Sequence, residues 1–152
     1  YVGLAWAEIG IVFTVMLIPY VLLELPLGKI ADDILGEKEI LVAGFIILAF
    51  FTALIPLTGT ASIIIWSALL FATRIGASFI EIMTETNFFR QVNGSDTNTI
   101  SLFRMLRPAS NIIAPLVATL ALFFVPLQYS FFILALVALI GVPISLKIHS
   151  NR

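Results

Sequence analysis

The sequence predicts an all-α membrane protein, a polytopic bundle of five transmembrane helices. Of its 152 residues, 61% are hydrophobic and only 11% are charged. Soluble globular proteins average about 25% charged residues, so this composition cannot cover a soluble surface. A bilayer core about 30 Å thick needs about 20 mostly apolar residues in a helix. Five runs of that kind lie between polar breaks, and we therefore expect residues 1–152 to form one helical bundle.

The polar breaks set the expected helices at about residues 6–27, 39–57, 61–89, 97–125 and 128–146. In the first span, Glu8 falls in the first turn, where a carboxylate suits the positive end of the helix dipole. The second span ends at the turn-forming residues 56–60. The third is longer than the hydrocarbon core and should project into water. The fourth follows the N-cap formers of residues 95–98, and the fifth ends before a polar tail.

The connections between these spans alternate in charge, which predicts their sidedness. Residues 56–60 and 125–128 are short and uncharged, whereas residues 28–39 and 90–98 are longer and charged. Seven of the eight basic residues then lie on one side of the membrane: Lys29, Lys38, Arg90, Arg104, Arg107, Lys147 and Arg152. The positive-inside rule makes that side cytoplasmic. We expect a protein integral to the cell membrane, plasma or inner, with a cytoplasmic C-terminus.

Several functional classes are excluded by what the sequence lacks. There is no cysteine, and the only histidine, His149, lies in the terminal tail. Thiolate metal sites, zinc sites within the bundle and histidine-based catalytic triads are therefore not expected, nor is any cofactor. An intramembrane protease would need His within the spans, so we expect no enzyme. A net charge of −1 gives too little positive field to bind nucleic acid.

The segment between the first two spans, residues 28–38, carries the most distinctive pattern. It reads Gly-Lys-Ile-Ala-Asp-Asp-Ile-Leu-Gly-Glu-Lys and resembles the cytoplasmic loop signature of the major facilitator superfamily. The matching residues are Gly28, Ala31, Asp32, Gly36 and Lys38. Gly28 would let the chain pass close to a neighbour, Gly36 would take a positive φ, and Asp32 would offer a carboxylate to helix N-termini or arginines. Two departures are one additional residue between Asp32 and Gly36, and Asp33 where the family commonly has Arg.

The resemblance implies a larger architecture. In the family this loop follows the second helix of each six-helix half, whereas here it follows the first span. The chain therefore resembles a partial half, spans eight to twelve of twelve, although a first half remains an alternative. The implied function is secondary active transport of a small solute by alternating access. The implied partners are the bilayer, the missing N-terminal half of the same polypeptide, and the solute, with a coupling proton as a further candidate. The alternative is a membrane assembly or scaffold protein that keeps the fold without transport.

Arg74 is the most informative charge, because it lies about 13 residues into its span and hence near mid-bilayer. A charge there costs several kcal/mol unless it faces water or a partner. At 100° per residue, Ser78 and Glu81 fall within about 40° of Arg74. Ala68, Ala72 and Gly76 form a small-residue ridge on nearly the opposite side. The candidate cavity or substrate residues are Arg74, Ser78, Glu81 and Asn111, the last on the fourth span.

The structural alternative is that Arg74 and Glu81 simply pair, although about 10 Å along the axis is a stretch for one bond. If this span is the tenth helix, the resemblance implies that it lines the central cavity. A second set of charges lies nearer the cytoplasmic side, and we expect an inner network of Glu85, Arg90, Arg104 and Arg107. The two fourth-span arginines would contact lipid headgroups, or would pair with Asp32, Glu85 or the other half.

Overall fold

The computed structural model describes residues 3–33, 36–92, 94 and 96–147. In these residues the chain forms five long helices and one short 3-10 turn. They are α1 (Trp6–Asp33), α2 (Glu37–Leu54), η1 (Ile55–Leu57), α3 (Ile63–Gln91), α4 (Thr97–Phe124) and α5 (Leu127–Leu146). All five α-helices are long and apolar enough to cross a membrane. The predicted all-α membrane bundle is confirmed, and α3, α4 and α5 begin and end within two residues of the expected bounds. Helix α2 ends three residues before the expected position, where η1 takes over.

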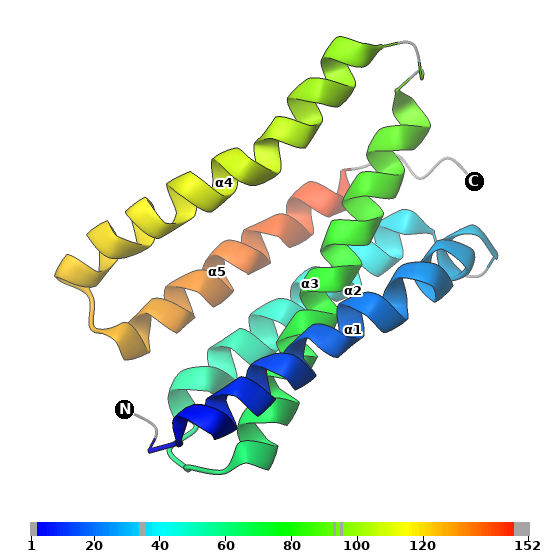
Figure 1. Ribbon diagram of the computed structural model, residues 1–152. Helices are drawn as coiled ribbons and strands as arrows, with labels where there is room; N and C mark the ends of the chain where they lie inside the picture. Colours follow the sequence, from blue (N-terminus) through cyan, green and yellow to red (C-terminus); the bar gives the residue numbers. More distant parts are fainter. Residues whose placement is uncertain (1–2, 34–35, 93, 95, 148–152) are drawn as a thin grey trace.

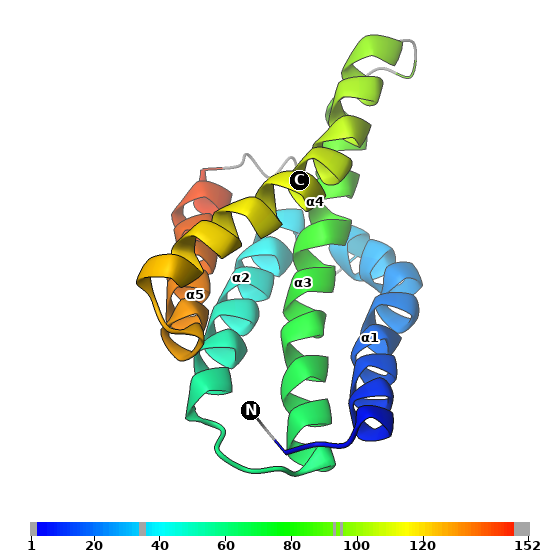
Figure 2. The same ribbon diagram turned by 60° about the vertical axis from the view of Figure 1, so that its left-hand side comes forward.

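Four of the helices lie side by side in the order α1, α3, α2, α5 (Figure 2). Helix α3 packs on both α1 and α2, and α5 packs on the other side of α2. Helix α4 leaves this row: it starts beside the end of α3 and crosses towards α5, with which it makes only sparse contact (Figure 1). No described residue of α4 is buried.

We call the end of the bundle at which α1, α3 and α5 finish the inner end, and the opposite end the outer end. Helix α1 reaches Asp33, six residues beyond the expected Leu27, so the first part of the loop motif is helical. Nothing between Gly28 and Asp33 stops a helix, because this stretch has no proline and a single internal Gly costs only about 1 kcal/mol.

Gly36 does not take the positive φ that the sequence suggested. It is the buried N-cap of α2, with φ −64° and ψ 156°. An N-cap residue takes extended angles because the chain enters the helix there, and those angles need no glycine. Burial against neighbouring helices is therefore the better explanation for a small residue at this position.

The backbones of α2 and α3 come close together where these helices cross at Gly44 and Gly76. A Cβ added to Gly76 would lie 2.6 Å from the backbone N of Leu48 and 2.8 Å from the carbonyl O of Gly44. The small-residue ridge is thus a packing surface at Gly76, as expected, but not at Ala68, which is exposed. The ridge prediction failed there because the two helices diverge towards the outer end, where a pocket opens between them.

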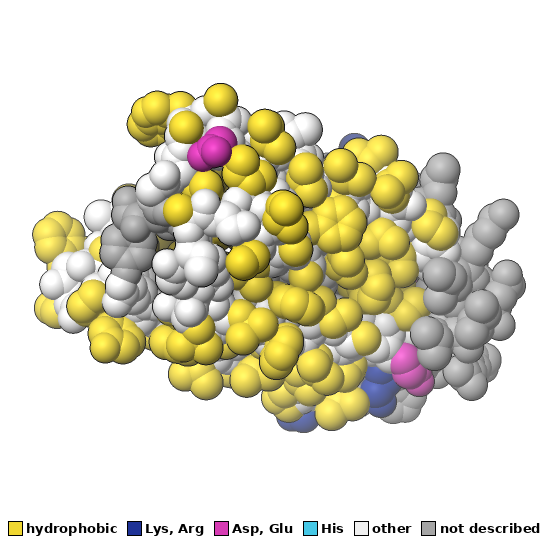
Figure 3. All heavy atoms as spheres, turned by 90° about the horizontal axis from the view of Figure 1, so that it is seen from below, with side chains coloured by type: hydrophobic (Ala, Val, Ile, Leu, Met, Phe, Trp, Pro, Cys, Tyr) yellow, Lys and Arg dark blue, Asp and Glu magenta, His cyan; other side chains and the backbone are white. Residues whose placement is uncertain are grey.

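The core is small and the surface is mainly apolar. Leu27, Ile40, Leu41 and Met83 form a buried cluster near the inner end, where α1, α2 and α3 meet. Elsewhere hydrophobic side chains dominate the exposed face, with few charges among them (Figure 3). Such a surface suits lipid or other membrane helices rather than water.

Candidate functional site

Arg74 lies on α3 and faces α1. Its guanidinium carbon sits 5.5 Å from the centroid of the Tyr20 ring, a cation–π geometry. Arg74 is 11 residues into a 29-residue helix, or roughly 16 Å from the outer start of α3. Its Nε is buried and has no hydrogen-bond acceptor. Among the described residues, no carboxylate forms an ion pair with this mid-span cation.

Ser78, one turn below Arg74, is completely buried, and its hydroxyl has no hydrogen-bond partner in the part of the chain that the structure describes. Ser67, seven residues above Arg74, has a buried hydroxyl in the same condition. Three of the four buried side-chain atoms without a hydrogen-bond partner in the described structure are therefore on α3, at positions that recur on one helix face. Sequence reasoning found Ser78 on this face and missed Ser67.

Glu81 forms an ion pair with Arg107 of α4 rather than with Arg74. Arg107 was expected to contact headgroups, Asp32, Glu85 or the other half, so this partner is a correction. In this conformation Glu81 does not form an ion pair with Arg74, which was the structural alternative. Two rings lie nearer the inner end: Phe88 of α3 stacks on Phe103 of α4 with centroids 3.8 Å apart. Together these contacts join α3 to α4.

A polar network that the sequence analysis missed ties α2 to α3 at the inner end. Arg90 Nη1 lies 2.9 Å from Glu37 Oε1, an ion pair whose angle is poor for a hydrogen bond. Asn87 Nδ2 donates to Glu37 Oε2 at 2.8 Å, and Gln91 Nε2 donates to Asn87 Oδ1 at 2.7 Å. The sequence analysis included Glu37 in the loop motif. Its position in the first turn of α2, where a carboxylate is favourable, could have marked it as a helix residue.

A crevice of about 480 Å³ lies between α1 and α3 towards the inner end. We call it the α1–α3 crevice; its lining residues are Tyr20, Glu24, Ile82, Glu85, Thr86, Phe89 and Arg90. Tyr20 belongs both to this crevice and to the Arg74 contact, so it connects the two. The expected inner network is therefore split: Arg90 pairs with Glu37, while Glu85 lines the crevice.

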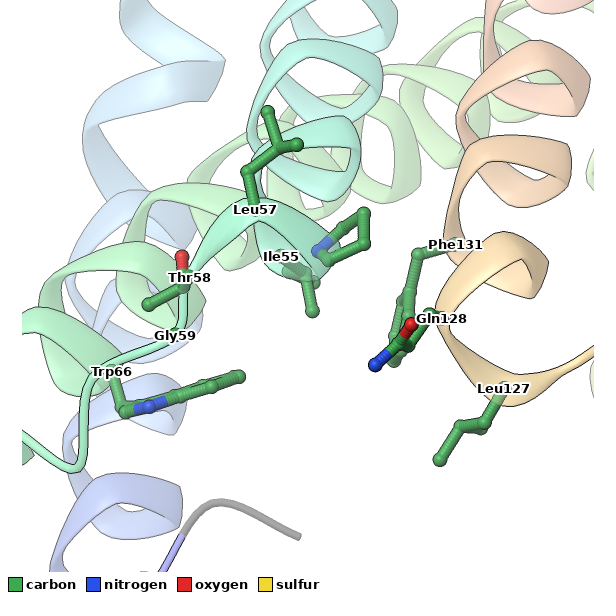
Figure 4. Close-up of a pocket in the computed structure, with 9 residues that line it drawn as sticks. Ile55, Leu57, Thr58, Gly59, Trp66, Leu127, Gln128 and Phe131 are labelled. Carbon is green, nitrogen blue, oxygen red and sulfur yellow. The ribbon is translucent and has the colours of Figure 1, made fainter.

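A second pocket, of about 450 Å³, opens at the outer end between the α2–α3 connection and the start of α5 (Figure 4). Trp66 closes one side, and its indole nitrogen donates to the carbonyl of Thr60 at 2.9 Å. Gln128 and Phe131 of α5 face it from the other side. No charged residue lines this pocket, so it offers shape and apolar area rather than recognition of charge.

The predicted site residues are thus only partly brought together. Arg74 faces α1, Glu81 faces α4, Ser78 is buried, and Asn111 is exposed on α4. Arg104 is also exposed. The side chains of the motif residues Gly28, Ala31 and Asp32 lie outside the described part of the structure. In the described residues, no group of three or more His, Cys, Asp or Glu side chains is placed to hold a metal ion.

Comparison with known proteins agrees with the loop motif and the helix pattern. A family model described as the Major Facilitator Superfamily matches residues 1–149. The chain therefore belongs to the major facilitator superfamily, a family of membrane transporters, and is an integral membrane protein in contact with the lipid bilayer. No curated protein and no solved structure matches the chain.

Proposed function

We propose that the chain is part of a twelve-helix secondary transporter that moves a small solute by alternating access. The observation that carries this proposal is Arg74, a cation near mid-span with no carboxylate partner among the described residues. Holding a charge at that depth is expensive, and intramembrane ionisable residues are most often retained for function. A structural scaffold would gain little from it.

The packed helices and the exposed helix α4 would have different roles in this transporter. Helices α1, α2 and α3 form a tightly packed unit, with α5 on the outside of α2. Helix α4 carries Arg104, Arg107 and Asn111 but buries no described residue. Arginines in a spanning helix need protein or water beside them, so α4 would face the cavity and a second set of helices, the N-terminal half of the full-length protein.

The mechanism we propose is conformational. The two halves would rock about the bound solute, and the inner end would face the cytoplasm. The loop motif would act as a latch at that end, with Asp32 contacting helix N-termini or arginines in one conformation only. Asp32→Asn in the full-length protein should then slow transport while expression stays close to that of the wild type, because it shifts a two-state equilibrium. Unchanged transport would remove the latch from the mechanism.

The decisive experiment is transport by proteoliposomes that contain the full-length protein. They would be incubated with a mixture of small metabolites, and the solutes accumulated inside would be measured by mass spectrometry against empty liposomes. At least one solute should accumulate, and Arg74→Gln should abolish its uptake. Lys147→Gln, which removes a cation at the end of α5, is the matched control and should transport normally.

Two outcomes would contradict the proposal. If no solute enters above the empty liposomes, in either direction of an imposed ion gradient, the scaffold alternative is favoured. If a solute enters and Arg74→Gln transports it as fast as the wild type, transport stands but Arg74 is not its site.

A further inference from the structure

We propose that the solute carries a single oxyanion group, a carboxylate or a phosphate, which Arg74 binds, and that Tyr20 positions the guanidinium for it. This inference rests on the proposed transport function and names the substrate class. The charges on and around the Arg74 face of α3 do not cancel. Glu81 is the nearest acidic residue on the Arg74 face of α3, and Arg107 already neutralises it. Arg74 therefore keeps its positive charge unopposed by any described carboxylate.

Among the described residues, nothing accepts a hydrogen bond from the Arg74 side chain. A guanidinium has five N–H donors and no acceptor, so only acceptors can satisfy it. Its Nε is buried without an acceptor, a condition that costs free energy in a dry site. A carboxylate or phosphate provides two oxygens in the geometry of the guanidinium fork, which an ammonium group or a hydroxyl cannot match. An oxyanion therefore supplies both the charge and the acceptors.

Tyr20 holds the Arg74 guanidinium while leaving its N–H donors available to a ligand. The centroid of the Tyr20 ring lies 5.5 Å from the guanidinium carbon of Arg74. This contact is not a hydrogen bond, so it occupies none of the guanidinium donors. A guanidinium that stacks on an aromatic ring keeps its N–H edges for a ligand. Tyr20 also lines the α1–α3 crevice, so the ring borders both the crevice and Arg74.

The crevice restricts the charge of the solute. Glu24 and Glu85 line it, both are exposed, and neither has an ion-pair partner among the described residues. Exposed charges are screened over about 8–10 Å, so they permit one anionic group to pass but oppose a solute with several separate anionic groups more strongly. Arg90 also lines the crevice, but its charge is paired with Glu37. One unopposed arginine, Arg74, behind two carboxylates favours a solute with one anionic group.

Binding can be tested separately from transport. The thermal midpoint of the purified full-length protein in detergent would be measured with small probes at equal ionic strength: sodium propionate, sodium methyl phosphate and ethylammonium chloride, with sodium chloride as the baseline. Propionate, methyl phosphate or both should raise the midpoint above the baseline, and ethylammonium should not. Small probes report the charged group rather than the shape of a particular solute.

Variants then locate the effect. Arg74→Gln should weaken oxyanion binding at least about tenfold, and Arg74→Lys should weaken it less, because Lys keeps the charge but loses the fork. Tyr20→Leu should weaken binding about three- to tenfold through loss of the cation–π contact, whereas Tyr20→Phe should bind as the wild type does. Tyr129→Leu and Lys147→Gln, exposed residues of α5 and its C-cap, are the controls and should leave binding unchanged.

The probe series and the variants together test whether Arg74 binds an oxyanion. Oxyanion stabilisation that disappears in Arg74→Gln supports the inference. Equal midpoints with propionate, methyl phosphate and chloride, stabilisation by ethylammonium alone, or undiminished oxyanion binding in Arg74→Gln would overturn it. If Arg74→Gln fails to fold, the wild-type probe series and Arg74→Lys decide. Arg74-dependent transport of a cationic or neutral solute would leave the transport proposal intact and remove only the oxyanion.

Discussion

Glu37 is the residue through which the start of α2 is bonded to the end of α3. One carboxylate oxygen faces Arg90 at 2.9 Å, and the other accepts from Asn87 at 2.8 Å. The side chain is 11% exposed, so water replaces these contacts poorly. Two helices that are antiparallel neighbours thus share one carboxylate at the inner end.

Glu37→Ala should lower the free energy of unfolding by about 1.5–3 kcal/mol, the range for hydrogen bonds to charged groups. The measurement is the thermal midpoint in detergent. Glu39→Ala is the matched control because Glu39 lies in the same first turn of α2 but is exposed, so both variants lose the same helix-dipole term. Equal losses in the two variants would show that the Glu37 contacts contribute nothing.

The ion pair between Glu81 and Arg107 joins α3 to α4 through polar groups. Arg107 is 60% exposed and Glu81 27%. Solvent screening therefore limits the pair, and a double-mutant cycle with Glu81→Gln and Arg107→Gln should give a coupling of about 0.5–1 kcal/mol. Thermal midpoints of the two single variants and the double variant provide the cycle. Strictly additive shifts would mean that the two side chains do not interact in solution.

At the scale of whole helices, the crossing of α2 and α3 depends on Gly76. A methyl group there meets the backbone of Leu48 and Gly44, and backbone cannot rotate away as a side chain can. Gly76→Ala should therefore force the helices apart and cost about 1–3 kcal/mol. The measurements are the thermal midpoint and the yield of monodisperse protein.

Gly10 provides the matched control for this crossing. It is also helical, but a Cβ added to it meets no atom within 4 Å. Gly10→Ala should leave stability unchanged or raise it by up to about 1 kcal/mol, because Ala favours the helix. If both variants behaved alike, close packing of α2 on α3 would not be what Gly76 provides.

The helices could be predicted from the sequence because span length is a one-dimensional property. Apolar runs such as residues 127–146 have to be about as long as the bilayer is thick, and both ends are marked by polar or turn residues. The end of α1 was missed because Asp33 marks a polar segment, whereas a helix can continue in water beyond the membrane. Hydropathy does not distinguish a polar loop from a polar helix end.

The contacts of the candidate site were harder to predict than its members. Helical periodicity placed Arg74, Ser78 and Glu81 on one face of a helix. It does not say which neighbour each side chain meets, because that depends on the rotation of α1 and α4 about their own axes. Tyr20 and Arg107 are the partners that this rotation selects. The expected single cavity wall is therefore divided between two neighbouring helices.

For the molecule as a whole, the alternation of the spans predicts the sides on which the connections lie. The α3–α4 connection and the C-terminal tail should share the cytoplasmic side, with the α2–α3 connection opposite. Cysteines introduced singly at Gly94, Ser150 and Thr60 can be labelled with a membrane-impermeant reagent, since the chain has no cysteine of its own. Gly94 and Ser150 should react from one side and Thr60 from the other. Shared labelling of Ser150 and Thr60 would overturn this topology; Ser150 itself lies outside the described residues.

The isolation of α4 has a consequence for biosynthesis. Its mean hydropathy, 1.4, is the lowest of the five spans, and it carries two arginines and two internal prolines. Each arginine opposes release from the translocon by up to about 2.5–3.5 kcal/mol, depending on its depth. Within the described structure α4 is held by the ion pair with Glu81, by the contacts of Phe103 with Phe88 and Phe89, and by sparse contact with α5. Insertion of α4 should therefore lag behind its synthesis and depend on α3 already being in the membrane. During this delay α4 should be the helix most accessible to quality-control proteases.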